Sequence, residues 1–496
     1  MKRKTEGLIF AVISAAFGIY IILRAWTIPI TVDESTTAVI HVQRTVLDTL
    51  TYSEEANPNN HILNTLLIKL LTGLFGWWPI VVRTPVLIGG FLYLWVAGLF
   101  SKKCSEQSWV RLFVFATLVG NPYLLEFFAL ARGYGLGAGL MMVALWQSWR
   151  FLEENDGKYM RNATIAAGLA VYSNFTLLLF FAPFMGLLLL SCWQLNPSLS
   201  QVWQRSKAAF SALAVFFALW YLPLSRLSKH PEMKFFTNID SLVAAVSDSV
   251  KAAIHNYPYF GNDTVEIMTW AIIVFAVCLW GVALWRWRNS GWKFSSDPRL
   301  FLVAVLPGAV LTNMVIVRLA DTHYLQARLA LFYYPLFALQ VGIAASWLWE
   351  WRRKTAWALM IPVFLLSSVN LGRNINLWIA SEWWFDPGTY IVLDYLKKTY
   401  EDEHRTEPYS LDTHHVMQNS LDFHLTLDPR GYGRYAKLVQ WHGLQEPKGD
   451  TDFYYAVSTN EVEKIMDRYE YVLWIPRGSF VLLRKKKTDA PSPQSR

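Results

Sequence analysis

The chain has 496 residues, of which 54% are hydrophobic and only 17% are charged. A soluble domain carries about 25% charged residues. This composition and the repeated apolar runs of about 20 residues therefore exclude a soluble protein and predict a polytopic membrane protein. The formal net charge of +8 does not indicate a nucleic-acid partner, because the basic residues gather in short loops between apolar runs, where they set orientation.

The first apolar run extends over residues 7–30 and follows the basic N-terminal sequence MKRK. The positive-inside rule therefore places the N-terminus in the cytoplasm. The run is too long for a signal peptide, and no small-residue cleavage site follows it. Arg24 interrupts it, and we expect this side chain to anchor at the membrane interface.

Two carboxylates, Asp33 and Glu34, follow this run directly, which places them at the outer surface of the membrane. Carboxylates so close to the hydrocarbon are costly and need a reason. A catalytic base, a cation site and a plain solvated loop are the three interpretations that we consider.

Hydropathy predicts ten further spans. They cover residues 79–100, 110–128, 135–152, 163–193 (two short helices that turn at Tyr172-Ser173-Asn174), 208–224, 266–287, 299–319, 328–350 and 355–372. The basic residues at 102–103, 286–293 and 352–354 mark cytoplasmic loops. The predicted fold is therefore an all-α membrane protein with about 11 transmembrane helices and its C-terminus outside.

Two segments of the first outer loop predict helices that lie at the membrane surface, over residues 35–50 and 61–76. The second is apolar but short for a bilayer core of about 30 Å. It also carries Lys69, and counting it as a span would move the basic pair at 102–103 outside. We therefore interpret it as an interfacial helix.

Charged residues become frequent after about residue 373, and alternating patterns predict strands at 471–474 and 479–483, with a helix at 390–400. We divide the chain into a transmembrane domain (1–372, with the first outer loop at 31–78), a C-terminal extracytoplasmic α/β domain (373–483) and a basic disordered tail (484–496). His414, His415 and His424 lack the spacing of metal ligands. The three cysteines include no Cys-x-x-Cys pair, so no disulfide framework or zinc site is predicted.

Four polar features lie on the predicted outer face. They are Asp33-Glu34, Asn57-Pro58-Asn59-Asn60-His61, Ala131-Arg132-Gly133-Tyr134 and the loop 322–328, which ends at Arg328. Carboxylates, a histidine and two arginines suit chemistry on an anionic lipid headgroup, because the planar Arg fork donates two parallel hydrogen bonds to phosphate.

Simpler interpretations stay open for each of these residues. Arg132 and Arg328 reach lipid phosphates in any membrane protein. His61 and Asn60 suit the start of a helix as a cap or an anchor. Arg83, a few residues into a span, suits the membrane interface equally well.

The order of these features resembles the C-type glycosyltransferase superfamily (GT-C), in the branch of protein O-mannosyltransferases and lipid A aminoarabinose transferases. The resemblance rests on Asp33-Glu34 after the first span, His61 at the start of the interfacial helix, Leu74-Phe75-Gly76, Val82-Arg83-Thr84-Pro85, Leu130-Ala131-Arg132-Gly133-Tyr134 and the Ser173-Asn174 turn. It covers residues 7–200 well and residues 328–336 more weakly.

The resemblance implies transfer of a hexosyl or pentosyl group, with inversion, from a polyprenyl-phosphate carrier to a glycan, lipid or protein acceptor on the outer face. Asp33 would be the base, with Glu34 as a helper or structural neighbour. Arg132 and Arg328 would hold the phosphate, and Asn60, His61 and Tyr134 would lie near the headgroup. The resemblance does not imply a definite cofactor. If the acceptor is itself a phosphate, Asp33 would orient it or bind a divalent cation.

Two other classes remain as alternatives. A transporter or flippase of lipid-linked sugars also needs outer-face arginines, although paired broken helices in two halves are not apparent in the sequence. A sensor or assembly protein would act through its C-terminal domain. The compact length favours a bacterial inner membrane, with the active site and the C-terminal domain facing the periplasm.

Overall fold

The computed structural model describes residues 3–53, 59–229, 239–254, 261–384, 386–439, 451–456, 462–463, 465–475 and 480–486. The chain divides into two compact units. The first comprises Met1–Arg24, Thr45–Leu67 and Arg83–Ile375, and the second comprises Ala25–Arg44, Ile68–Val82 and Asn376–Arg496. Parts of the predicted first outer loop thus belong to the same unit as the C-terminal domain.

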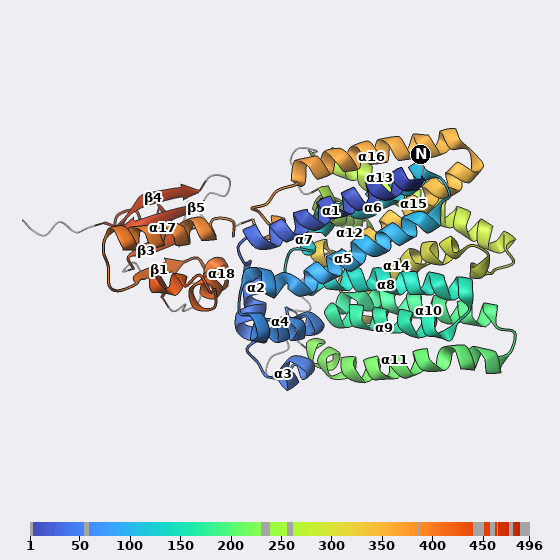
Figure 1. The fold of residues 1–496 in the computed structure, drawn as a ribbon, viewed down its shortest axis with the longest axis horizontal. Coiled ribbons are helices and arrows are strands. Elements are labelled where there is room, and N and C mark those ends of the chain that lie inside the picture. Colours follow the sequence, from blue (N-terminus) through green and yellow to red (C-terminus); the bar gives the residue numbers. More distant parts are fainter. Residues whose placement is uncertain are drawn as a thin grey trace, which may run out of the picture. The chain divides into compact units, whose positions relative to one another are not determined.

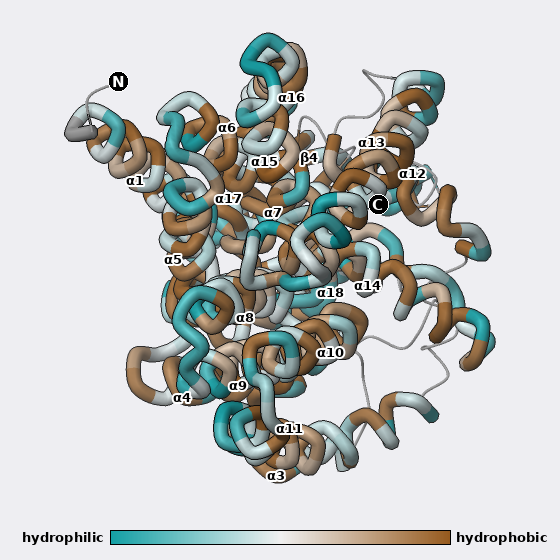
Figure 2. Tube along the Cα trace, turned by 90° about the vertical axis from the view of Figure 1, so that its right-hand side faces the viewer, coloured by the Kyte–Doolittle hydropathy of each residue, from teal (hydrophilic) through white to brown (hydrophobic). Residues whose placement is uncertain are grey.

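The chain is a multi-pass membrane protein. In the described residues, seven helices are long and apolar enough to cross a membrane: α1 (Arg3–Thr27), α5 (Pro79–Cys104), α10 (Leu178–Leu195), α11 (Leu199–Leu227), α13 (Gly261–Asn289), α14 (Pro298–Ala320) and α16 (Arg353–Asn374). The other four predicted spans correspond to α6 (Ser108–Val119), α8 (Gly133–Glu154), α9 (Gly157–Ser173) and α15 (Tyr333–Trp351). Figure 2 shows apolar residues in brown along these helices and polar residues in teal toward their ends.

Helices α8, α9 and α11 lie side by side, with α9 in contact with both of the others (Figure 1). Small residues let neighbouring helices approach closely. A Cβ atom on Gly139 of α8 would lie only 2.2 Å from the backbone oxygen of Gly89 on α5. The contact between these two helices therefore depends on glycine at this position.

The predicted span at 110–128 is interrupted. Helix α6 ends at Val119, and the short helix α7 (Pro122–Phe127) begins after Asn121, whose side chain accepts a hydrogen bond from the Leu124 N–H. The sequence Gly-Asn-Pro explains the break, because a residue before proline avoids the helical conformation and proline suits a helix start. The run at 163–193 is two helices as predicted, and Asn174 at the break is extended.

The first outer loop matches one prediction and differs from another. Helix α4 (Ile62–Phe75) covers the predicted interfacial helix. The single helix predicted at 35–50 is wrong, because α2 (Val32–Ser35) continues as a π-helical segment, Thr36–His41, and a separate helix α3 (Val46–Thr51) follows. Thr45 starts α3 by accepting a hydrogen bond from the Asp48 N–H at 3.1 Å, and this capping favours a new helix.

The span predicted at 328–350 also begins differently. Residues Ala327–Ala330 form a 3-10 turn, η6, and α15 starts only at Tyr333. The turn is anchored by α12 (Leu242–Ile254), which the sequence analysis did not predict, through a 2.7 Å hydrogen bond from the Ala327 N–H to Asp248.

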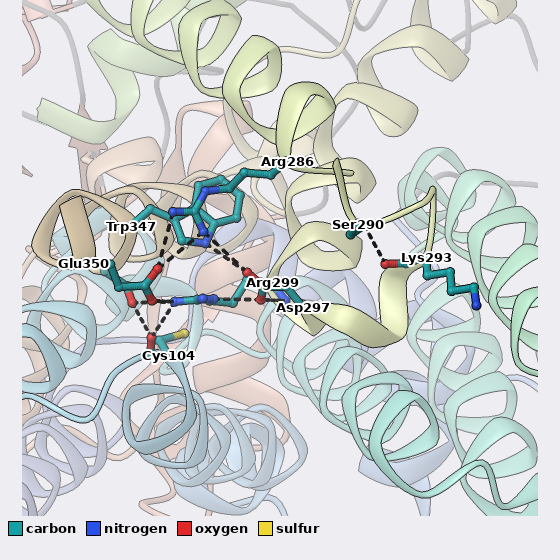
Figure 3. Close-up of polar contacts among 9 residues, drawn as sticks. Cys104, Arg286, Ser290, Lys293, Asp297, Arg299, Trp347 and Glu350 are labelled. Atoms are coloured by element: carbon teal, nitrogen blue, oxygen red, sulfur yellow. Dashed lines mark hydrogen bonds and ion pairs between the residues drawn. The ribbon is translucent and has the colours of Figure 1, made fainter. Parts of the chain in front are cut away.

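A polar cluster joins α13, α14 and α15 at the predicted cytoplasmic side (Figure 3). Arg299 lies 2.8 Å from Asp297 and 2.5 Å from Glu350. Arg286 approaches Glu350 to 3.4 Å, and the Trp347 indole donates to Asp297 at 3.2 Å. The cluster contains both charge signs and satisfies its members mutually, so we assign it to stability and not to chemistry.

The C-terminal part of the second unit is a mixed sheet with helices on one face. The strands are β1 (Tyr409–Thr413), β2 (Ala436–Leu438), β3 (Phe453–Ala456), β4 (Tyr469–Ile475) and β5 (Phe480–Lys485), in the order β2-β1-β3-β5-β4. β1 is parallel to β2 and β3, whereas β5 is antiparallel to β3 and β4. The predicted helix and both predicted strands are confirmed, as α17 (Thr389–Asp402), β4 and β5.

The core of this sheet follows from the alternation of side chains along β3. Phe453 and Tyr455 pack in one apolar cluster with α17 and α18 (His415–Thr426), and Tyr454 and Ala456 pack in another on the opposite face. Strand β5 continues to Lys485, so the predicted tail does not begin at residue 484. Residues 487–496 lie outside the described part of the chain.

Candidate functional site

Arg132 is the central residue of the candidate site in the first unit. It is the N-cap residue of α8, its side chain is only 1% exposed, and its Nη2 donates to the Asn59 Oδ1 at 2.8 Å. The preceding residue, Ala131, accepts a hydrogen bond from the Asn64 side chain at 3.0 Å. The start of α4 thus holds both the side chain of Arg132 and the backbone beside it.

His61 and Tyr134 complete this group. Their rings meet edge to face, with centroids 5.0 Å apart. The approach depends on Gly133, because a Cβ atom there would lie 1.9 Å from the Ser173 carbonyl oxygen and 2.8 Å from the His61 Cβ. The Ser173-Asn174 turn, α4 and α8 therefore meet at a point where only glycine fits.

Asn60 is buried beside this group and links its supporting helices. Its side chain donates to the Thr49 carbonyl at 3.3 Å and accepts from the Thr65 hydroxyl at 2.9 Å. Its own carbonyl accepts from the Tyr52 hydroxyl. Of the predicted site residues, Asn60, His61, Arg132 and Tyr134 are therefore brought together, with Asn60 in a supporting position.

This group suits an anionic ligand. A buried arginine is costly unless its donors are used, and the first turn of a long helix adds a positive potential from its unpaired N–H groups. Arg132 provides both features at one point. Phosphate is the ligand for which this combination is most often used in proteins.

Arg328 lies on the η6 turn and is half-buried. Two hydrogen bonds join this segment to α12. The Tyr334 hydroxyl donates to the Ser249 carbonyl at 2.6 Å, and the Ala327 N–H donates to Asp248 at 2.7 Å. These contacts fix the turn that carries Arg328. Its role as a phosphate ligand stays a prediction.

Asp33 and Glu34 belong to the second unit and differ in their environments. Glu34 is fully buried, and its carboxylate accepts a hydrogen bond from the Thr31 backbone N–H at 2.9 Å, as in half of a capping box. Asp33 is half-buried. Of the two carboxylates, Asp33 is thus the less buried one, and Glu34 supports the turn.

Sequence analysis missed two residues that bind the backbone just before Asp33. The Ile30 N–H donates to His424 Nε2 at 3.2 Å, and the Val32 N–H donates to Asp386 Oδ2 at 3.0 Å. His424 and Asp386 are almost completely buried. The available signal was the His-x-x-x-Asp spacing of His424, in the last turn of α18, and Asp428, which follows the end of that helix.

Metal binding receives no support from the described residues, which contain no group of three or more His, Cys, Asp or Glu side chains arranged to hold an ion. His424 uses one ring nitrogen for Ile30, and its Nδ1 lies 2.7 Å from Asp428. A divalent cation at Asp33 stays an open alternative.

The interpretation of Arg24 as a plain interfacial anchor is wrong. Its side chain is 1% exposed and lies 3.5 Å from the Glu126 carboxylate, which is itself 3% exposed. It also donates to the Tyr20 hydroxyl at 3.3 Å. Arg83 is likewise fully buried in the protein, so an anchor at the lipid interface does not describe it either.

The structure is similar to solved glycosyltransferases along nearly the whole chain. ArnT from Cupriavidus metallidurans in its apo state matches with a TM-score of 0.51 at 12% identity, over 96% of this chain and 98% of ArnT. ArnT bound to undecaprenyl phosphate matches with a TM-score of 0.51 at 11% identity, over 95% and 97% of the two chains. The archaeal oligosaccharyltransferase AglB from Archaeoglobus fulgidus matches less well, with a TM-score of 0.44 at 12% identity over 98% of this chain and 75% of AglB.

The two ArnT matches show a fold like that of the GT-C glycosyltransferases. The ArnT fold is matched over 95–96% of this chain. No protein-family model matches the sequence, and a comparison with curated proteins finds no significant match.

Proposed function

We propose that this protein is an integral membrane glycosyltransferase that moves a sugar from a polyprenyl-phosphate carrier to an acceptor on the extracytoplasmic face of the membrane. The observation that carries the proposal is the buried Arg132 at the start of α8, hydrogen-bonded to Asn59 and next to His61 and Tyr134. The fold around it matches ArnT, which has been crystallised with undecaprenyl phosphate.

The chemistry requires one base and one site for the leaving group. The acceptor hydroxyl oxygen forms a bond to the anomeric carbon, and the bond from that carbon to the phosphate oxygen breaks on the opposite face. The hydroxyl proton passes to the base. The polyprenyl phosphate leaves as a stabilised anion, so no general acid is needed, unlike in hydrolysis of a glycosidic bond.

In this proposal Asp33 is the base, because it is the less buried carboxylate of the turn after α1, while Glu34 supports that turn. Arg132 stabilises the charge that develops on the departing phosphate, which is the type of interaction that contributes most to such reactions. Arg328 is a second phosphate ligand. The donor is a polyprenyl-phosphate-linked hexose or pentose, and inversion follows from a single displacement.

The test is sugar transfer in proteoliposomes that contain the purified protein. A panel of radiolabelled polyprenyl-phosphate sugars is supplied with lipid, glycan and peptide acceptors. We expect radioactivity to move from the carrier to one acceptor class with wild type, and to stay on the carrier with Arg132→Ala. If the labelled donor crosses the bilayer intact and is never cleaved, the protein is a transporter and the proposal is wrong.

A further inference from the structure

Three successive backbone N–H groups precede Asp33, and each donates to a different buried side chain. Ile30 donates to His424 at 3.2 Å, Thr31 to Glu34 at 2.9 Å and Val32 to Asp386 at 3.0 Å. Two of the three acceptors come from the C-terminal domain. The backbone that carries Asp33 is therefore fixed by residues more than 350 positions away in the chain.

Helix α18 holds the same segment from a second direction. The Ser420 hydroxyl donates to the Ile30 carbonyl at 2.6 Å, so both polar groups of the Ile30 backbone are bound by this helix. After Asp33, the Ser35 hydroxyl donates to the Asn419 carbonyl, and the Asn419 side chain donates to Thr36 at 2.9 Å. Figure 1 shows α18 beside α2, in agreement with these contacts.

His424 is oriented by the residues behind it. Its Nδ1 lies 2.7 Å from Asp428, while its Nε2 accepts from Ile30. The imidazole is therefore the tautomer with its proton on Nδ1, since Nε2 must keep its lone pair. Asp428 is also bound by the Arg430 Nε at 3.1 Å, so the acceptor that faces Ile30 has a fixed direction.

Asp386 accepts the Val32 N–H from a buried position. Burial is the largest influence on the Asp386 carboxyl and raises its pKa well above the ordinary Asp value. The hydrogen bonds from Val32 and Ser420 act in the opposite direction, and the neighbouring Glu34 and Asp33 raise the pKa by smaller amounts. A protonated carboxyl still offers an acceptor oxygen to an N–H group. An asparagine of the same shape offers an equivalent oxygen.

We propose that His424 and Asp386 are positioning residues for the reaction, and that the C-terminal α/β domain serves to hold the Asp33 turn in its working geometry. This inference rests on the proposed function, in which Asp33 is the base. A shift of about 1 Å at a reacting group costs up to about 100-fold in rate. The hydrogen bonds to Ile30 and Val32 are the contacts that prevent such a shift.

The experiment compares a disruptive and a conservative variant at each position in the full-length protein in proteoliposomes. His424→Phe keeps a ring without an acceptor, whereas His424→Gln keeps an acceptor. Asp386→Leu removes the acceptor, whereas Asp386→Asn retains it. We expect kcat to fall by about 10- to 100-fold in the two disruptive variants, with the donor KM changed only a few-fold, and to recover mostly in the conservative ones.

A second readout does not depend on activity. Hydrogen–deuterium exchange of a peptide that covers residues 28–36 should speed up in the two disruptive variants and stay at the wild-type rate in Asp33→Asn. His404→Asn, at an exposed histidine of the same domain, is the matched control and should leave both readouts unchanged.

The outcomes separate the two proposals. If wild type transfers no sugar, the proposed function fails, and the exchange rates alone decide whether His424 and Asp386 hold the turn. If wild type is active but His424→Phe and Asp386→Leu keep the wild-type kcat, the positioning role is wrong, whatever the exchange rates. If Asp386→Asn is as inactive as Asp386→Leu, Asp386 acts through its own proton and the positioning role is again wrong.

Discussion

His424 accepts a hydrogen bond from the backbone N–H of Ile30 across 394 positions of sequence. The two residues belong to the same compact unit, in which the segment after α1 is bound by α18. A C-terminal domain of a membrane enzyme is easily regarded as a separate attachment. Here it forms part of the structure that surrounds the proposed catalytic carboxylate.

The two adjacent carboxylates should respond differently to loss of charge. Asp33→Asn should lower turnover by about 100-fold or more, because general base catalysis contributes about 100- to 10,000-fold. Glu34→Gln should cost much less, since a glutamine oxygen can still accept from Thr31. The measurement is the turnover of a labelled donor by each of the two variants at equal protein level. A larger loss for Glu34→Gln would transfer the role of base to Glu34.

Arg132 should not tolerate lysine. Lys keeps the charge but loses the planar fork, so Arg132→Lys should lower donor turnover by about 10-fold or more, within the range expected for one charged hydrogen bond. Arg318, an exposed arginine in the last turn of α14, is the matched control, and Arg318→Lys should retain full turnover. Equal turnover in both variants would assign Arg132 to structure alone.

The buried pair of Arg24 and Glu126 should make a large contribution to stability. Glu126→Gln leaves the Arg24 charge buried without its carboxylate, which costs about 3–5 kcal/mol. The exposed pair of Lys103 and Glu153, at 43% and 31% exposure, should cost at most about 1 kcal/mol in Lys103→Gln. Thermal unfolding in detergent measures both variants. If the apparent melting temperature falls no more for Glu126→Gln than for Lys103→Gln, the proposed contribution of the Arg24–Glu126 pair is wrong.

Asp386 should make stability fall as pH rises. Burial raises its pKa well above the ordinary value of 3.8. A carboxyl whose pKa is higher in the folded state than in the unfolded state stabilises the fold fully at pH values below the unfolded-state pKa. This stabilisation is lost as the pH rises through the folded-state pKa. Wild type should therefore lose stability relative to Asp386→Asn as the pH is raised from about 4 to about 8. Melting temperatures at several pH values test this, and a constant difference would show that Asp386 does not titrate in this range.

The C-terminal domain should lie outside the cytoplasm, as the distribution of basic loops predicts. Alkaline phosphatase fused after Lys398 should be active, and a fluorescent protein that folds only in the cytoplasm should stay dark at the same position. An inactive phosphatase together with a fluorescent fusion would show that the C-terminal domain lies in the cytoplasm. Asp33 and Arg132 would then not face the compartment in which the proposed acceptor is found.

The sequence by itself determined the membrane class, most helices and the local features of the site. Apolar runs and basic loops are sufficient for these, because lipid requires each span to satisfy its own backbone hydrogen bonds. The ordered set of motifs from Asp33-Glu34 to the Ser173-Asn174 turn indicated the GT-C fold. Local capping rules also account for the breaks at Asn121 and Thr45.

Only the tertiary structure decided which charged residues are buried and what they contact. Arg24 looks like an interfacial anchor in sequence, but its partner Glu126 lies about 100 positions later. His424 and Asp386 have no local pattern that points to Ile30 and Val32. Hydropathy reports how a segment partitions between water and lipid, whereas a buried polar contact depends on which distant side chain reaches the same point, and that is fixed only when the chain packs.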